Sequence, residues 1–173
     1  ASDRESATEF AAKVRKLGFE VSVNFMGISN YSPQDILSLP TLLTEYRDRI
    51  DYFYFADSFG SLTPGETRRL FDILRFGAEV RIGFHPHNNM QLALANTLEA
   101  VENGITIVDG SILGMGRGGG NLHTEVYLAY LERSFPKTFC ALPLIRFADL
   151  FMNDFAQKHH WGYSMPQLMS GIL

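Results

Sequence analysis

The sequence contains a single cysteine, Cys140, among 173 residues. A lone cysteine cannot form an intrachain disulfide, which favours a reducing compartment, so we expect a cytoplasmic protein. No apolar run approaches the roughly 18 residues of a membrane-spanning helix, and the N-terminus is polar and unlike a signal peptide. We therefore expect neither a membrane partner nor a secretory leader.

Positive charge is also scarce. Lysine and arginine number 15 against 19 acidic residues, which gives a net charge of −4, and the basic residues form no cluster. Because nucleic-acid-binding surfaces are basic, no nucleic-acid partner is expected. Hydrophobic residues make up 46% of the chain, enough for a substantial core, so disorder is not expected. The length corresponds to about one domain.

Helical and strand-like patterns alternate along the chain. Strands are expected at residues 20–25, 51–56, 80–85 and 106–113. Helices are expected at about residues 2–17, 33–49, 63–77 and 89–103, with a fifth beginning near His123. Ser32 before a proline, and Thr63 three residues before a glutamate, are helix-start signals. Strict alternation implies a parallel sheet, as in a (β/α) barrel or a doubly wound sheet, with functional residues at the carboxyl ends of the strands.

The strongest chemical signal is a pair of histidines, His85 and His87, where the third expected strand ends. Strand side chains alternate between faces, so both imidazoles point to the same side, about 7 Å apart at the backbone. From that separation both rings can converge on one metal ion. The alternative is a pair of ordinary surface or hydrogen-bonded histidines.

Two further loops follow expected strands. Ser58 can donate a hydrogen bond to a ligand carboxylate, although Asp57 and Ser58 can equally satisfy the backbone amides of a turn. The spacing of Gly114, Gly116 and Gly119 fits G-x-G-x-x-G, which makes a nucleotide-binding module an alternative function. Against this alternative, no acidic residue ends a strand about 20 residues later.

Together, these motifs resemble the second half of the metal-dependent aldolase and lyase superfamily with a TIM barrel. The resemblance is strongest to 4-hydroxy-2-oxovalerate aldolase, and extends to hydroxymethylglutaryl-CoA lyase and isopropylmalate synthase. It runs from about Glu9 to Glu132 and is carried by five ordered motifs. They are Ala56-Asp57-Ser58, Gly83-x-His85-x-His87-Asn88-Asn89, Ala95-Asn96, Val108-Asp109-Gly110-Ser111, and the glycine run Gly114-Met115-Gly116-Arg117-Gly118-Gly119-Gly120, which is followed by Asn121 and Thr124-Glu125.

The resemblance implies an α/β fold: an incomplete (β/α) TIM barrel of about the last four units, with parallel strands and helices on the outer face. Residues 1–135 would form this half barrel, and residues 136–173 a C-terminal helical extension. The glycine run would then be a tight loop at the mouth of the barrel and not a pyrophosphate-binding loop.

The resemblance also implies a site. His85, His87 and Asn121 would bind a divalent metal, Mn²⁺ or Mg²⁺, while Ser58 and His85 would contact a 2-keto acid substrate. The implied activity is that of a lyase or aldolase, which cleaves or forms a carbon–carbon bond through a metal-stabilised enolate. The sequence leaves the acceptor substrate open.

One part of the family pattern has no counterpart here. The family's first strand carries an Arg-Asp pair, with a histidine base soon after in the aldolases, and nothing in this chain corresponds to either. We therefore expect a fragment that is incomplete for catalysis, or alternatively a non-catalytic half barrel that self-associates. Four strands cannot close a barrel, so an apolar inner face should be exposed. Homo-oligomers, or association with a missing N-terminal half, are expected.

Overall fold

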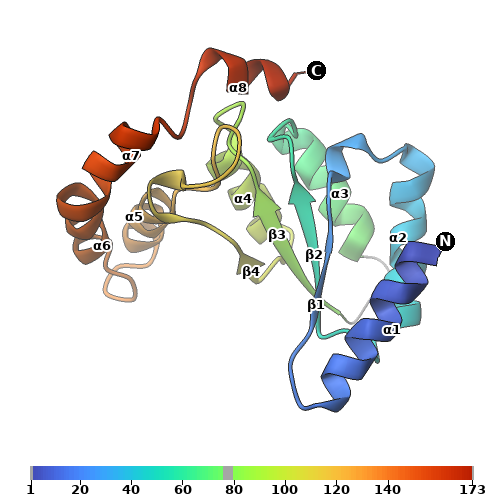
Figure 1. The fold of residues 1–173 in the computed structure, drawn as a ribbon. Helices are drawn as coiled ribbons and strands as arrows, with labels where there is room; N and C mark the ends of the chain where they lie inside the picture. Colours follow the sequence, from blue (N-terminus) through green and yellow to red (C-terminus); the bar gives the residue numbers. More distant parts are fainter. Residues whose placement is uncertain (1, 76–79, 173) are drawn as a thin grey trace.

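The computed structural model describes residues 2–75 and 80–172 and contains one parallel sheet of four strands. The strands lie in the sequential order β1-β2-β3-β4 (Figure 1). Their bounds are Ser22–Phe25 for β1, Tyr52–Asp57 for β2, Arg81–Pro86 for β3 and Ile107–Val108 for β4. Every pairing is parallel, as the alternating pattern predicted. The predicted end of the third helix, at Gly77, lies outside the described residues.

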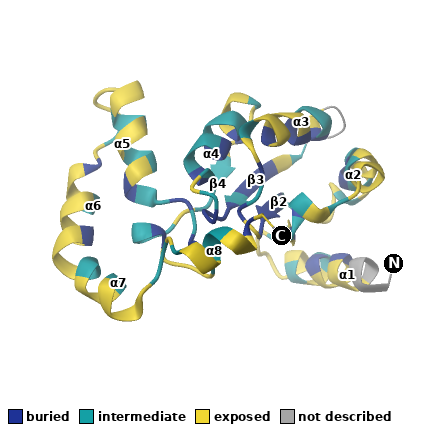
Figure 2. Ribbon diagram, turned by 90° about the horizontal axis from the view of Figure 1, so that it is seen from above, coloured by how far each residue is buried: buried dark blue, intermediate teal, exposed yellow. Residues whose placement is uncertain are grey.

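Four helices cover one face of this sheet. They are α1 (Ser2–Lys16), α2 (Pro33–Tyr46), α3 (Pro64–Arg75) and α4 (Ala93–Glu102). Alternate strand residues, including Phe25, Phe53, Phe55 and Phe84, form one buried cluster with apolar residues of the helices. Figure 2 shows α2, α3 and α4 in an arc outside the strands. A doubly wound sheet would carry helices on both faces, so the fold is part of a TIM barrel, as predicted.

The opposite face of the sheet is polar, and the expectation of an apolar inner face was wrong. Tyr52 and Arg81 lie side by side on it, with the guanidinium 4.0 Å from the ring centroid and donating to the phenol oxygen at 2.8 Å. Tyr54 covers Gly83, where a Cβ atom would lie 2.6 Å from the tyrosine ring. The tyrosine rings cover the strands while their hydroxyl groups keep polar partners, so this face presents polar groups.

The largest differences from the predicted boundaries are at the start of α4 and the end of β4. Helix α4 begins at Ala93 and not near Asn89, because Asn88 Oδ1 accepts a hydrogen bond from the Ala93 amide and both asparagines are buried in the preceding loop. Strand β4 has only two residues, since the chain leaves the sheet after Val108 and forms a short 3₁₀ turn, η2 (Ile112–Gly114). This departure pairs Ser111 with the segment that leads into α5.

The C-terminal region is helical and returns to the carboxyl edge of the sheet (Figure 1). The final helix contacts the loop after β3 through Asn89. The side-chain amide of Asn89 donates to the Gln167 carbonyl oxygen at 3.0 Å and to Ser170 Oγ at 2.8 Å. No helix in residues 2–75 or 80–172 has the length and apolarity to cross a membrane. The remaining elements are η1 (Ile28–Asn30), α5 (Thr124–Ser134), α6 (Leu142–Phe147), η3 (Ala148–Met152), α7 (Asn153–His159) and α8 (Met165–Ser170). The domain boundary after residue 135 stays a prediction.

The predicted capping box at the start of α3 is present and supports a stability prediction. Thr63 Oγ1 accepts from the Glu66 amide, and the Glu66 carboxylate accepts from both the amide and the hydroxyl of Thr63. We expect Thr63→Ala to lower the free energy of unfolding by about 1 kcal/mol, as for other N-cap residues. Urea denaturation would measure the loss.

The same capping box predicts how that loss depends on pH. Hydrogen bonds from Thr63 lower the pKa of Glu66. The stabilisation is therefore present above the ordinary glutamate pKa and is lost as the pH falls through the depressed pKa. The difference in free energy of unfolding between Thr63→Ala and the native chain should therefore become smaller in acid. Thr41→Ala, at an exposed position inside α2, is the control, and equal losses in the two variants would contradict the prediction.

Candidate metal and substrate site

His85 and His87 lie where β3 reaches the carboxyl edge, and each ring is held through Nδ1. His85 Nδ1 is 3.1 Å from Asp109 Oδ2, and His87 Nδ1 is 3.2 Å from the Arg117 carbonyl oxygen. A carbonyl oxygen or an ionised carboxylate can only accept, so in both rings Nδ1 carries the hydrogen. The lone pair of each imidazole is therefore on Nε2. Histidines that bind metals are commonly oriented in this way by a carboxylate or a carbonyl group.

The two rings are also close to each other. Their centroids lie 5.2 Å apart with an interplanar angle of 71°. A metal ion sits about 2.0–2.1 Å from an imidazole nitrogen, so this separation is compatible with a shared ion. Burial, with a smaller contribution from the neighbouring His85, lowers the pKa of His87. His87 is thus neutral at pH 7, which is the form that binds metals.

Asn121 pairs with His87 in an isolated antiparallel β-bridge. Its Nδ2 donates to the Met115 carbonyl oxygen at 3.1 Å and more weakly to Ser111 Oγ at 3.4 Å. Its Oδ1 is buried and has no hydrogen-bond partner in the described part of the chain. A buried acceptor without a partner lowers the stability of the fold by about 1–3 kcal/mol, so a ligand that bonds to this oxygen would recover that energy.

A divalent cation fits this donor set, which is incomplete. Two imidazole nitrogens and one amide oxygen are suitable ligands for a metal such as Mn²⁺. Within residues 2–75 and 80–172, however, no group of three or more histidine, cysteine or acidic side chains could hold a metal.

Sequence reasoning missed the role of Asp109. Its carboxylate binds both His85 and the hydroxyl of Tyr54. Burial of the phenol, followed by the negative charge of Asp109, raises the pKa of Tyr54. Asp109 directly follows β4, the strand beside β3, so its position at the carboxyl edge was a usable signal.

Ser58 is the first residue of the loop after β2 and contacts two other segments. Its Oγ accepts from the Gly27 amide at 2.8 Å, and its carbonyl oxygen accepts from Arg117 Nη2 at 2.8 Å. Among the described residues no acceptor takes the hydroxyl hydrogen of Ser58, so a ligand can accept it. The neighbouring Asp57 accepts from the Ser61 and Leu62 amides, which is the turn role considered from the sequence. Burial raises the pKa of Asp57.

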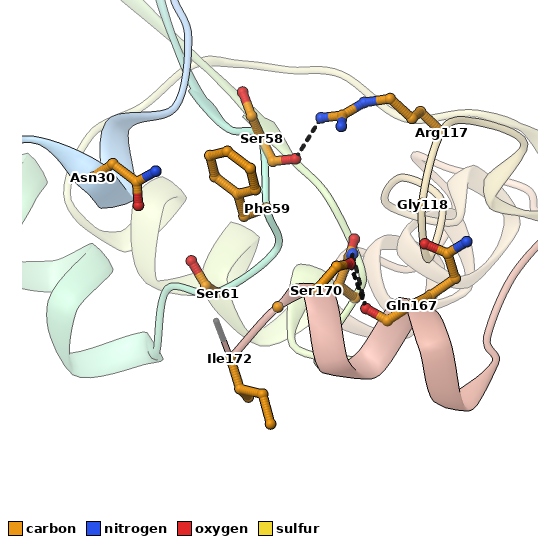
Figure 3. A pocket seen from close by; sticks show the side chains of 11 residues that line it. Asn30, Ser58, Phe59, Ser61, Arg117, Gly118, Gln167, Ser170 and Ile172 are labelled. Atoms are coloured by element: carbon orange, nitrogen blue, oxygen red, sulfur yellow. Dashed lines mark hydrogen bonds between the residues drawn. The ribbon is translucent and has the colours of Figure 1, made fainter.

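A pocket of about 720 Å³ opens beside Ser58 at this edge (Figure 3). It is bounded by the loops after β1, β2 and β3, by the glycine run and by α8. Asn89 and Arg117 line it, and the carbonyl oxygen of Arg117 connects it to His87. His85, His87 and Asn121 do not line it, so the histidine pair and the pocket are adjacent parts of one edge.

The glycine run packs tightly against the loop that follows β3. The Gly119 amide donates to Asn89 Oδ1 and the Gly120 amide to the Arg117 carbonyl oxygen. A Cβ atom on Gly119 would lie 2.6 Å from Asn89 Cα. These amides are already bonded, and helices cover only one face of the sheet, so the structure does not favour a nucleotide-binding module.

The fold and the polar carboxyl edge define part of a TIM-barrel domain whose site is built on strand ends. Residues 2–148 match the HMGL-like family model, and the chain belongs to the HMGL-like family, which includes aldolases and lyases. The resemblance inferred from the motifs is therefore confirmed.

Two curated relatives illustrate the similarity. Over 119 residues the chain is 40% identical to the 4-hydroxy-2-oxovalerate aldolase of Bacillus thuringiensis, covering 69% of this chain and 34% of that protein. Over 165 residues it is 31% identical to the oxaloacetate decarboxylase of Mycobacterium tuberculosis, covering 95% and 48%. The chain thus spans between a third and a half of the length of these relatives.

Solved structures show the same fold. The N-terminal domain of a candidate aldolase from Bacteroides vulgatus superposes with a TM-score of 0.85 at 32% identity, covering 98% of this chain and 56% of that one. HMG-CoA lyase from Bacillus subtilis gives a TM-score of 0.73 at 22% identity, covering 94% and 57%. The latter similarity concerns the fold alone.

Proposed function

We propose that the chain carries the metal-histidine part of a divalent-metal-dependent carbon–carbon lyase acting on a 2-keto acid. One arrangement carries the proposal: two histidines that are bonded through Nδ1 and so keep Nε2 free, and Asn121, which pairs with His87 in a β-bridge and whose buried Oδ1 has no partner in the described part of the chain. The curated relatives support the substrate class, because 4-hydroxy-2-oxovalerate and oxaloacetate are both 2-keto acids.

In this proposal His85, His87 and Asn121 hold the cation. The mixed nitrogen and oxygen set suits Mn²⁺ better than Mg²⁺, which prefers oxygen ligands. The bound cation supplies Lewis-acid stabilisation of negative charge on the keto oxygen. Asp109 and the Arg117 carbonyl group keep both imidazoles in the tautomer that offers Nε2.

Ser58 has a substrate role in the proposal. Its hydroxyl group accepts from the Gly27 amide and keeps its own hydrogen free. That hydrogen is donated to the carboxylate of the keto acid. Because Ser58 is 7% exposed, its position is set by packing and not by the solvent.

The chain is incomplete for this chemistry. Among the described residues, no third histidine, cysteine or acidic side chain joins the two histidines in a group that could hold a metal. We propose that the remaining strands of the barrel supply such a side chain, either from an N-terminal half or from an associated chain. The two sheet edges, at β1 and β4, are where such strands would pair.

Nuclear magnetic resonance of pyruvate tests this proposal. We expect Mn²⁺ together with the native chain to broaden the pyruvate methyl signal more than Mn²⁺ alone does. Propionate, which lacks the keto oxygen, should show a much smaller effect. A chain in which both His85 and His87 are alanine is the control and should match free Mn²⁺. Equal broadening of pyruvate and propionate would contradict the 2-keto acid assignment.

A further inference from the structure

The pocket beside Ser58, called here the carboxyl-edge pocket, has an unusual charge distribution. Arg117 is the single charged side chain among its described lining residues, and none of these residues is acidic. The other polar side chains at its wall include Asn30, Ser61, Gln167 and Ser170, which Figure 3 shows around the opening. The pocket is therefore positive and rich in hydrogen-bonding groups, which suits an anion.

The backbone of Arg117 is fixed by its two glycine neighbours. A Cβ atom on Gly116 would lie 2.5 Å from Asn121 Nδ2, and one on Gly118 would lie 3.1 Å from Asn89 Nδ2. The glycine run is therefore packed against Asn121 of the proposed metal site on one side and against Asn89 of the pocket on the other. The arginine thus occupies the boundary between the two.

The guanidinium group of Arg117 has unused hydrogen-bonding capacity. Nη2 donates one hydrogen bond, to the Ser58 carbonyl oxygen, out of the five N–H groups that arginine carries. In the described part of the chain no carboxylate forms an ion pair with it. The one bond that it makes holds the group against the pocket wall (Figure 3).

We propose, resting on the proposed function, that the carboxyl-edge pocket takes the distal carboxylate of a 2-keto dicarboxylate and that Arg117 determines this specificity. A guanidinium binds a carboxylate through two parallel hydrogen bonds, which lysine or an amide cannot reproduce. The same residue orients His87 through its carbonyl oxygen and faces the pocket with its side chain. The keto end of the substrate lies at the histidines, and the distal end reaches Arg117.

Calorimetric titration with two keto acids of equal length tests the inference. In the presence of Mn²⁺ we expect the native chain to bind 2-oxoglutarate about tenfold more tightly than 2-oxovalerate, which lacks the distal carboxylate. Arg117→Gln should abolish this preference. Arg133→Gln, which alters an exposed arginine of α5 outside the pocket, should retain it.

Mn²⁺ titrations run in parallel separate this inference from the proposed function. The carbonyl oxygen of Arg117 that holds His87 is retained in Arg117→Gln, and the Mn²⁺ affinity of this variant is measured beside that of Arg133→Gln to distinguish loss of the guanidinium group from loss of the metal site. Equal affinities for the two keto acids, or a preference that survives Arg117→Gln, would overturn the inference and leave the metal site intact. A native chain that binds neither keto acid also overturns it, and failure to bind Mn²⁺ would show that the proposed function fails too.

Discussion

Replacing His87 with alanine is expected to lower the affinity of the chain for Mn²⁺ by about 100-fold or more. Loss of an outer-shell partner of a metal ligand already costs about 10- to 100-fold, and loss of the ligand itself should cost at least as much. His87 is neutral at pH 7 because burial lowers its pKa, so the native chain has no proton to displace there. Calorimetric titration with Mn²⁺ would measure the change.

Two variants make this test specific. His159→Ala changes an exposed histidine at the end of α7 and should leave Mn²⁺ affinity unaltered. Asp109→Asn keeps the shape of the side chain but removes the charge that orients His85, and should give an intermediate loss. Equal affinities in the native chain and His87→Ala would eliminate the metal-site assignment. Urea denaturation of each variant would show whether folding has changed.

Replacing Gly60 with alanine is expected to destabilise the fold by about 2–5 kcal/mol. Gly60 has φ of +57°, a left-handed conformation that costs other residues about 1–2 kcal/mol. A Cβ atom there would lie 2.5 Å from the Asn89 amide nitrogen and 2.9 Å from the His87 carbonyl oxygen. Both atoms belong to the backbone and cannot move aside, so overpacking adds about 1–3 kcal/mol.

Gly65→Ala is the matched control for this prediction. Gly65 lies in the first turn of α3, and nothing is within 4 Å of the place where its Cβ atom would be. Alanine there should leave stability unchanged or raise it by up to about 1 kcal/mol, because it restricts the unfolded chain. The free energies of unfolding in urea would be compared. Similar stabilities for the two variants would show that the loop after β2 can relax.

The sequence by itself determined the order of the elements and the class of the fold. Alternating periodicity selects helices and strands, and the helix-start signals at Ser32 and Thr63 act through residues only three positions away. A period of two likewise sends both His85 and His87 to one face of a strand end. All of these features are local, so they follow from spacing along the chain.

Only the tertiary structure decided how the site is completed. His85 is 24 residues from Asp109, and Arg117 is 59 residues from Ser58, so no local pattern links these pairs. The return of α8 over the carboxyl edge was hidden for the same reason. The polar inner face was readable from strand alternation, because Tyr52, Tyr54 and Arg81 occupy positions that alternate with the buried core residues. Spacing specifies the neighbours of a residue within one element. Partners on different elements depend on how those elements pack. Here packing decides which nitrogen of each histidine ring is free and that the side chain of Arg117 faces the pocket.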